Sequence, residues 1–182
     1  MQVLEAITQR RSIRRFEDKP VPDDLLWRII EAGTWAPSAG NMQAWEFVIV
    51  KDPQARRKLV DTTDAGTTSR AGVYTQEWIM DAPIVLVVCY DVKRMTARYG
   101  QKGRELLTKL DCMLCVQNML LAATHFGLGT CCVVGFDPPA LMKALDIPEE
   151  ITPILLIPMG YPAEHPQPPY RLPVDDVVRM VL

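Results

Sequence analysis

The spacing of apolar residues in the first third of the chain predicts an amphipathic helix. Leu26, Ile29 and Ile30 recur at i, i+3 and i+4 and therefore share one helical face. Asp23 is the expected N-cap of this helix, and Gly33 is expected to end it. The helix leads directly into a loop rich in proline and small residues.

The remaining apolar pattern predicts further helices and strands along the whole chain. A continuous apolar run over residues 84–90 is typical of a central, buried strand. Helices are expected over residues 3–9, 53–61 and 138–145, and the other strands over 47–50, 130–136 and 152–157. Helices and strands are thus both abundant, and the pattern alone leaves the α/β and α+β classes open.

A long helix is predicted over residues 104–126. After Asp111 it is apolar nearly all round, so it must be covered on most of its surface. It either crosses the middle of the domain or packs against a second subunit. His125 stands near its end, where a polar helix terminus is a simpler explanation than catalysis.

Two stretches show no clear periodicity. Residues 62–78 carry Tyr74 and Trp78 near their end, and these aromatic residues are either walls of a substrate site or ordinary surface packing. After Tyr161 the chain is rich in proline, which predicts an extended tail over about residues 162–182.

Bulk properties are those of one folded domain over residues 1–182. The chain is 48% hydrophobic and 23% charged, and its formal net charge of -2 gives no general attraction to nucleic acid or anionic membranes. The first residues do not form a signal peptide, and no uninterrupted apolar run approaches the roughly 18 residues that span a bilayer. We therefore expect a cytoplasmic protein that binds neither membrane nor nucleic acid.

The cysteines number five, and their apolar surroundings predict reduced thiols. Cys112 and Cys115, together with Cys131 and Cys132, could in principle supply four thiolates to zinc or an iron–sulfur cluster. However, the first pair lies within an apolar helix, and adjacent cysteines rarely direct both sulfur atoms at one metal. We expect no metal site.

An arginine cluster near the amino terminus is the first candidate for chemistry. Arg10, Arg11 and Arg14, with Ser12 between them, present several fork-shaped donors that match phosphate oxygens and stay charged at physiological pH. Taken alone, such a cluster is more often a solvated surface or a nucleic-acid contact. The mildly acidic chain favours a discrete anion.

The loop after the first amphipathic helix is the second candidate. Pro37 fixes its own φ, while Gly40 and Asn41 readily adopt positive φ, so the small residues between them can approach a flat ligand closely. The simpler alternative is an ordinary connection between a helix and a strand.

These two motifs, in this order, resemble the FMN-dependent nitroreductase family. Further matches are the segments 111–118 and 127–129, residues 130–136, and the closing segments 159–162 and 170–173, so the resemblance extends over the whole chain. It implies an α+β fold with a central, mostly antiparallel sheet surrounded by helices. It also implies a homodimer with FMN at the subunit interface.

The resemblance assigns roles to individual residues. Arg10 and Arg171 are expected to bind the FMN phosphate, with Arg11 and Ser12 nearby, while Arg14 supports the pyrimidine edge of the flavin electrostatically. From the other subunit, the flavin is expected to be lined by Pro37, Ser38, Ala39 and Asn41. The backbone along the ring edge, near the reactive atom N5, is expected to comprise Cys132, Val133, Val134 and Gly135.

The chain departs from the family pattern at two places. Thr75 and Trp78 stand where many relatives have an asparagine and a lysine for the pyrimidine, so Arg14 is expected to act alone there. Pro169 stands where relatives with two basic residues in the closing motif have the first of them.

The implied reaction moves two electrons from NADH or NADPH through FMN to a nitroaromatic, a quinone or a similar flat acceptor, without a dedicated acid or base. One alternative is a specialised reductase or dehydrogenase of the same fold, acting on an enone, an iodinated aromatic or a peptide-derived ring. A protein of a different class would bind FMN without turnover, or would bind a nucleotide-bearing partner through the arginines.

Overall fold

A four-stranded sheet forms the centre of the protein, whose computed structural model describes residues 1–64 and 75–181. The strands are β1 (Trp45–Val50), β2 (Ile84–Asp91), β3 (Gly129–Thr130) and β4 (Ile151–Gly160). Their order in the sheet is β1-β2-β4-β3, and every neighbouring pair is antiparallel. The antiparallel sheet with surrounding helices confirms the predicted α+β class.

Strand β2 divides the interior into two cores. Its alternate residues Ile84, Leu86 and Val88 face one core, and Val85 and Val87 face the other. All of them are almost completely buried. This explains the continuous apolar run, because a strand covered on both faces has no polar side.

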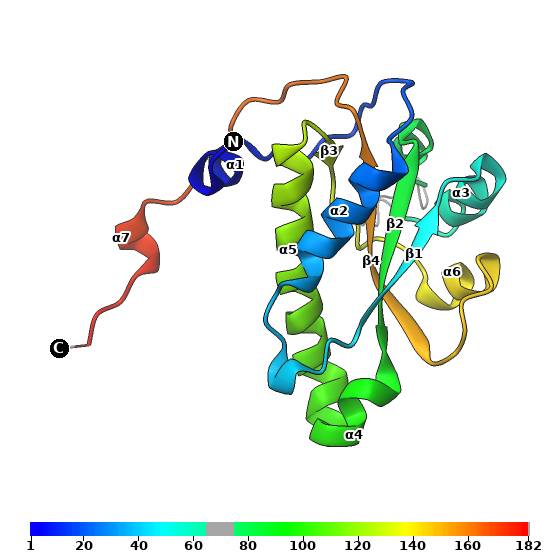
Figure 1. Cartoon of the computed structure of the whole chain (residues 1–182), viewed down its shortest axis with the longest axis vertical. Coiled ribbons are helices and arrows are strands. Elements are labelled where there is room, and N and C mark those ends of the chain that lie inside the picture. The colour runs from blue at the N-terminus through cyan, green and yellow to red at the C-terminus, as the bar shows by residue number, and fades with distance from the viewer. Residues whose placement is uncertain (65–74, 182) are drawn as a thin grey trace, which may run out of the picture.

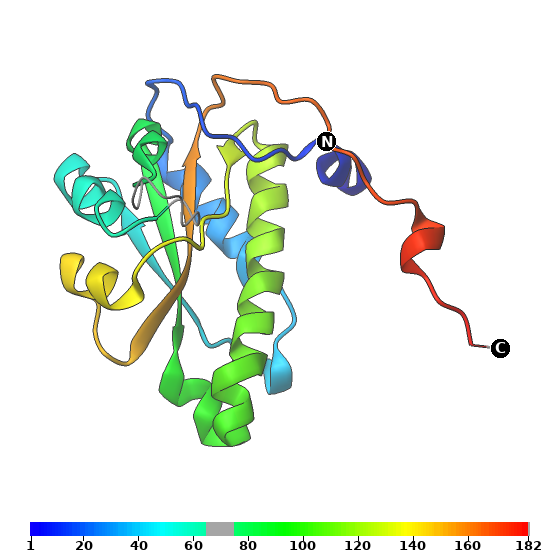
Figure 2. The ribbon, with the colours of Figure 1, turned by 180° about the vertical axis from the view of Figure 1, so that it is seen from behind.

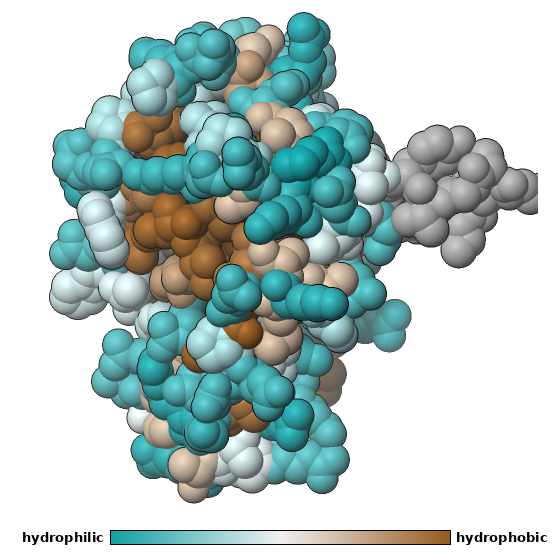
Figure 3. Space-filling model, turned by 90° about the vertical axis from the view of Figure 1, so that its right-hand side faces the viewer, coloured by the Kyte–Doolittle hydropathy of each residue, from teal (hydrophilic) through white to brown (hydrophobic). Residues whose placement is uncertain are grey.

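Helices cover the two faces of the sheet as separate pairs (Figure 1). The first core is formed with α2 (Asp23–Thr34) and α5 (Thr108–His125), and the second with α3 (Pro53–Val60) and α6 (Pro138–Ala144). On the side that carries α3 and α6, an apolar area is visible among mostly polar residues (Figure 3).

Helix α2 packs very closely against α5 at Gly33. A Cβ atom built at this position would lie 2.6 Å from Cγ of Met119 and 2.9 Å from Sγ of Cys115. Gly33 was expected to end the helix, whereas it lies within it and allows this close approach. Asp23 is also not the N-cap: Pro22 occupies that position and no side chain caps the helix.

The helical chain before α5 is longer than predicted. Helix α4 (Val92–Lys102) and one π-turn (Gly103–Leu107) precede α5, so helical structure begins at residue 92 rather than 104, with a kink at Gly100, whose φ is 54°. The carboxylate of Asp91 caps α4 by accepting hydrogen bonds from the N–H groups of Lys93 (2.8 Å) and Arg94 (3.1 Å).

One face of α5 is covered by the rest of the chain and the other is not. Cys112, Cys115 and Val116 are fully buried, whereas Leu110 and Leu114 are about half exposed. By length and composition the helical run Val92–His125 could cross a membrane. Core helices of soluble proteins pass the same test, and α5 packs its inner face on α2 and the sheet.

The strand predicted over residues 130–136 is mostly absent. Only Thr130 belongs to β3, and Val133 pairs with Leu156 in a single bridge. Phe136 instead pairs with Thr63, because the chain leaves the sheet and crosses towards the end of α3. Residues 131–135 are therefore an irregular segment whose backbone groups are not all used in the sheet.

Both ends of the chain project from the body. Helix α1 (Val3–Gln9), the tail and its short helix α7 (Val174–Val177) lie to one side in both ribbon views (Figures 1 and 2). Residues 165–181 are exposed, as the proline-rich composition predicted for an extended tail. The single domain over residues 1–182 stays a prediction.

Candidate functional site

The arginine segment runs alongside the end of β3. Ser12 pairs with Thr130 in a parallel bridge, and the N–H of Ile13 donates to the Thr130 carbonyl at 2.9 Å. The neighbouring Gly129 has no room for a side chain, since a Cβ atom would lie 2.7 Å from Ile13. The sheet edge thus places the arginines next to Cys131 and Cys132.

Polar groups of this segment converge on the Cys131 thiol. Burial raises the pKa of Cys131, while Arg14, the Ser12 hydroxyl and Arg10 act in the opposite direction. Burial likewise raises the pKa of Cys132, and Arg10 again opposes the shift. The pairing of Ser12 with Thr130 thus places the predicted residues Ser12 and Cys132 on adjoining segments, and Arg10 acts on the pKa of both cysteine thiols.

Arg11 has a different environment from its neighbours. Its Nη1 donates to the carbonyls of Thr8 (2.7 Å) and Arg10 (2.9 Å), which ties the end of α1 to the arginine segment. Its Nε is buried, and none of the described residues accepts a hydrogen bond from it. Arg11 also lines an open cavity of about 420 Å³ with Gln9 and Glu164.

Arg14 is held by its backbone and by an aromatic ring. Its N–H donates to Oε1 of Glu164 at 2.5 Å, and its guanidinium carbon lies 5.9 Å from the centroid of the Trp78 ring. Neither contact neutralises the guanidinium charge, because the Glu164 carboxylate is engaged by backbone groups and the ring is uncharged. Arg14 thus presents a positioned cation.

The irregular segment after Cys131 exposes backbone donors. Val133 is buried, whereas the side chain of Val134 is 73% exposed. Among the described residues, no acceptor is found for the N–H groups of Val134 and Gly135. The Gly135 carbonyl, in contrast, accepts from the Asp64 N–H (2.9 Å) and from Nε2 of Gln76 (3.3 Å). Within the described residues, the N–H groups of Val134 and Gly135 thus have no acceptor, while the Gly135 carbonyl is held by two donors.

The Pro37 loop contains a short 3₁₀ turn, η1 (Ala39–Asn41). Gly40 and Asn41 both have a φ of 56°, the left-handed conformation that their residue types favour. Ser38 Oγ accepts from the Gln43 N–H at 3.1 Å, which closes the turn. The loop thus has the positive-φ residues that its composition predicted, and Pro37 and Asn41 line an open pocket of about 570 Å³.

One hydrogen bond ties the Pro37 loop to α5. The Ala39 N–H donates to Oδ2 of Asp111 at 2.9 Å. Burial raises the pKa of Asp111, and the hydrogen bond from Ala39 partly opposes the shift. A buried carboxylate in the first turn of α5 thus fixes the loop.

The two groups of predicted site residues lie at opposite ends of α5 (Figure 1). The Pro37 loop contacts Asp111 in the first turn, and the arginine segment pairs with Thr130 just beyond the last turn. At about 1.5 Å per residue, the axis from Asp111 to His125 is roughly 21 Å long. A single chain therefore does not bring the two groups together. Arg171 is exposed and lies in the tail after β4.

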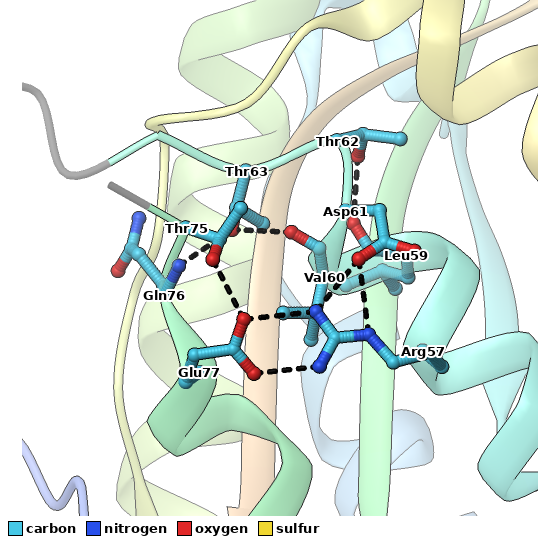
Figure 4. A network of polar contacts seen from close by, with 9 residues as sticks. All are labelled: Arg57, Leu59, Val60, Asp61, Thr62, Thr63, Thr75, Gln76 and Glu77. Atoms are coloured by element: carbon cyan, nitrogen blue, oxygen red, sulfur yellow. Dashed lines mark hydrogen bonds and ion pairs between the residues drawn. The ribbon is translucent and has the colours of Figure 1, made fainter. Parts of the chain in front are cut away.

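A polar network that the sequence did not indicate lies beside the irregular segment (Figure 4). Arg57 bonds Glu77 through both terminal nitrogens (2.6 and 2.9 Å) and Asp61 at 2.7 Å, while the Thr75 hydroxyl donates to Glu77 at 2.7 Å. These contacts lower the pKa of Glu77 to about 2, chiefly through Arg57. They attach η2 (Glu77–Asp81) to α3.

The two aromatic candidates have different outcomes. Trp78 is half-buried, packs against buried residues of two apolar clusters and lies near Arg14, which favours its packing role. Tyr74 lies outside the described residues. Thr75 stands at a sequence position that the family pattern assigns to the flavin pyrimidine, but its hydroxyl donates a hydrogen bond to Glu77.

The cysteines are all free thiols, and only Cys132 is exposed. Burial raises the pKa of Cys89, Cys112 and Cys115 to about 12. Within residues 1–64 and 75–181, no group of three or more His, Cys, Asp or Glu side chains has the arrangement of a metal site.

An antiparallel sheet wrapped by helices, with the arginine segment paired along its edge, defines an α+β protein. Residues 7–161 match the model of the nitroreductase family, so the chain belongs to that family, as its motifs predicted. The predicted enzyme class, an oxidoreductase, is confirmed by the same assignment.

Individual relatives cover nearly the whole chain. A protein of Thermus thermophilus named NADH dehydrogenase is 32% identical, over 97% of this chain and 96% of its own. The crystal structure of a nitroreductase family protein from Streptococcus pneumoniae is 28% identical and superimposes with a TM-score of 0.85, covering 99% of this chain and 100% of its own. The NADPH:FMN oxidoreductase of Vibrio harveyi, solved with NAD+, is 29% identical with a TM-score of 0.83, covering 98% and 76%.

Proposed function

We propose that this protein transfers two electrons from NADH or NADPH through FMN to nitroaromatic, quinone or similarly flat acceptors. The observation that carries the proposal is the pairing of Ser12 with Thr130, which brings the arginine segment to the start of residues 131–135, where the N–H groups of Val134 and Gly135 have no acceptor among the described residues. FMN as cofactor and a nicotinamide as electron donor agree with the family and with the name of the Vibrio harveyi relative.

The residues fit the two chemical ends of FMN. Arg10 offers a charged fork for the phosphate, and Ser12 offers a hydroxyl on the same side. At the other end, Gly135 lets the backbone present its N–H without a side chain. Arg14 adds a positive charge that no carboxylate neutralises in the described chain. The Arg14 guanidinium and the Gly135 N–H would stabilise negative charge that develops on the flavin, because donors that are already in place need no reorganisation during the reaction.

The bound flavin supplies the redox chemistry by accepting a hydride and returning two electrons. The chain supplies binding and electrostatics: Arg10 and Arg171 hold the phosphate, and Arg14 favours negative charge at the pyrimidine edge. The backbone donors of Val134 and Gly135 keep one protonation state throughout. The described residues thus provide placement for the reaction without an acid or base of their own.

We also propose that the enzyme is a homodimer with one flavin at each of two equivalent interface sites. The Pro37 loop and the arginine segment of one chain lie too far apart to hold the same small molecule. The exposed apolar face of α5, including Leu110, Met113 and Leu114, provides a surface that a second copy would bury. A cytoplasmic location without nucleic-acid or membrane binding is the matching proposal.

The test is an absorbance spectrum of the purified protein before and after each reduced nicotinamide. The proposal expects a yellow protein that releases FMN on denaturation, bleaches with NADH or NADPH, and regains its colour with a quinone or nitroaromatic acceptor. A colourless protein that does not take up FMN would refute it. A flavin that bleaches with neither nicotinamide would indicate a passive FMN-binding protein.

The main alternative keeps the fold and the flavin but changes the acceptor. A specialised reductase or dehydrogenase would show slow, unselective turnover of quinones and fast turnover of one enone, iodinated aromatic or peptide-derived ring. Steady-state kinetics with a panel of these acceptors and both nicotinamides separates the two.

A further inference from the structure

Gln76 makes the densest set of contacts near the irregular segment. Its side-chain Nε2 donates to the carbonyl of Asp64 at 2.6 Å and to the carbonyl of Gly135 at 3.3 Å. Its backbone N–H donates to Oγ1 of Thr63 at 2.9 Å, which fixes the residue itself (Figure 4). One carboxamide therefore links two backbone segments far apart in the sequence.

The Gly135 carbonyl is consequently held by two donors. The Asp64 N–H is the second, at 2.9 Å, and the neighbouring Asp137 N–H donates to the Thr62 carbonyl at 2.9 Å. Two donors on one carbonyl restrict the orientation of the peptide that follows Gly135 and so limit the ψ angle of this glycine. A glycine without such restraint has wide conformational freedom.

The contact is also sterically tight. A Cβ atom at Gly135 would lie 2.4 Å from the Asp64 carbonyl oxygen and 3.2 Å from Nε2 of Gln76. Only glycine allows the two backbones to approach so closely, and only a side chain with an N–H donor can satisfy both carbonyl oxygens at the position of Gln76. A carboxylate there would face two acceptors with no hydrogen to share.

We propose that Gln76 is a positioning residue: it anchors the Gly135 carbonyl and so holds in place the end of the segment whose Val134 and Gly135 N–H groups face the flavin. The proposal rests on the proposed function, since it assumes that these donors face bound FMN. Gln76 acts through the backbone and touches neither phosphate arginine in the structure. Its effect is on the reaction more than on cofactor retention.

The test compares Gln76→Glu with Gln54→Glu, an equal change on the exposed surface of α3. For Gln76→Glu we expect FMN to bind within about threefold of the unaltered protein. We expect flavin reduction by the preferred nicotinamide, in single turnover, to slow by about tenfold or more, the loss expected when a fixed donor is displaced. Amide hydrogen exchange in residues 131–137 of the apoprotein should be faster than in Gln54→Glu.

Two results would overturn the inference. One is a reduction rate in Gln76→Glu equal to that of Gln54→Glu with FMN bound. The other is a loss of FMN affinity as large as the loss of rate, which would make Gln76 a support of the whole pocket. If Gln76→Glu does not fold, Gln76→Ala is judged by the same criteria. If the unaltered protein binds no FMN, the proposed function fails, while the exchange measurement still tests the contact with Gly135.

Discussion

The guanidinium carbon of Arg14 lies 5.9 Å from the centre of the Trp78 ring, at the place where the family pattern has a second cation instead of an aromatic residue. A cation over an indole is oriented without losing its charge. Trp78 itself is fixed, because it packs against buried residues of two apolar clusters. Arg14 and Trp78 therefore provide one oriented positive charge, whereas the family pattern implies two, because it has a lysine at the position of Trp78.

Removing the Trp78 ring should weaken the hold on Arg14 and, through it, on FMN. We expect Trp78→Leu to lower FMN affinity about two- to fivefold, corresponding to roughly 0.5–1 kcal/mol for an exposed cation–π contact. Trp78→Phe should lose less. In an Arg14→Ala background, Trp78→Leu should have little further effect on the dissociation constant measured by fluorescence titration. An equal loss in both backgrounds would show that Trp78 acts independently of Arg14.

The phosphate assignment predicts a larger effect for two arginines from opposite ends of the chain. Arg10→Ala and Arg171→Ala should each lose a charge-assisted contact of about 1.5–3 kcal/mol, so FMN retention should fall roughly ten- to a hundredfold. Lys143→Ala, in the last turn of α6, is the control for loss of a positive charge. Normal flavin content in both arginine variants would contradict their assignment.

The separation of the two residue groups predicts complementation between chains. Arg10→Ala removes one group, and a bulky Pro37→Trp obstructs the other, so each variant alone should bind little FMN. In a mixed dimer, one flavin site contains both substitutions, because it takes the arginine segment from the Arg10→Ala chain and the loop from the Pro37→Trp chain. The other flavin site contains neither substitution. Differently tagged chains, co-expressed and purified through both tags, should therefore carry about half the flavin of the unaltered dimer. Flavin at the level of the separate variants would show that each site is built from one chain.

The hydrogen bond between Ala39 and Asp111 gives a pH-dependent prediction. Because burial raises the pKa of Asp111, the folded protein holds this proton more strongly than the unfolded chain, whose pKa is near the ordinary 3.8. Below the pKa of the unfolded chain, protonation of Asp111 therefore stabilises the folded state. This stabilisation is lost as the pH rises through the higher pKa of the folded protein. Asp111→Asn removes the titration and keeps an oxygen that can accept the hydrogen bond.

The stability difference between Asp111→Asn and the unaltered protein should thus change in favour of the variant as the pH rises from about 3 to 7. Urea unfolding at several pH values measures it. A stability difference that stays constant over this range would show that the pKa of Asp111 is the same in the folded and the unfolded protein.

The thiols should differ strongly in reactivity. Burial raises the pKa of Cys89, Cys112 and Cys115 to about 12, and Cys131 is buried as well, so none of the four should react with a thiol reagent in the native protein. Cys132 is exposed and should react slowly, because its own pKa is raised. We expect one reactive thiol before denaturation, none in Cys132→Ser, and slower reaction of Cys132 when FMN is added.

Much of the architecture could be predicted from local pattern. The run over residues 84–90 identified a strand buried on both faces, and Leu26, Ile29 and Ile30 identified the buried face of α2. The strand predicted over residues 130–136 was wrong because its apolar residues lie in different environments: Val133 pairs with Leu156 of β4, whereas Phe136 pairs with Thr63. Only the tertiary structure separates these environments.

Some residues of the candidate site could likewise be predicted from the sequence, and others depend on tertiary structure. Arg10, Ser12 and the Pro37 loop were found because their residue types and order resemble a family motif. Gln76 and Glu77 were not, since their partners lie on other elements and no periodicity marks them. The family pattern placed Trp78 at the same flavin edge as Arg14, but nothing in the sequence indicated the contact between the Trp78 ring and the Arg14 guanidinium.

The close packing at Gly33 has a consequence beyond its own helix. A side chain there would clash with Met119 and Cys115 unless these side chains or α2 shift, and α2 leads directly into the Pro37 loop. In the proposed dimer that loop serves the neighbouring copy's flavin. A substitution at Gly33 that shifts α2 would then impair the flavin site of the neighbouring copy and spare the site at the altered chain's own arginine segment. A mixed dimer would therefore keep one working site, and the loss of activity in cells that express both forms would follow the share of altered chains.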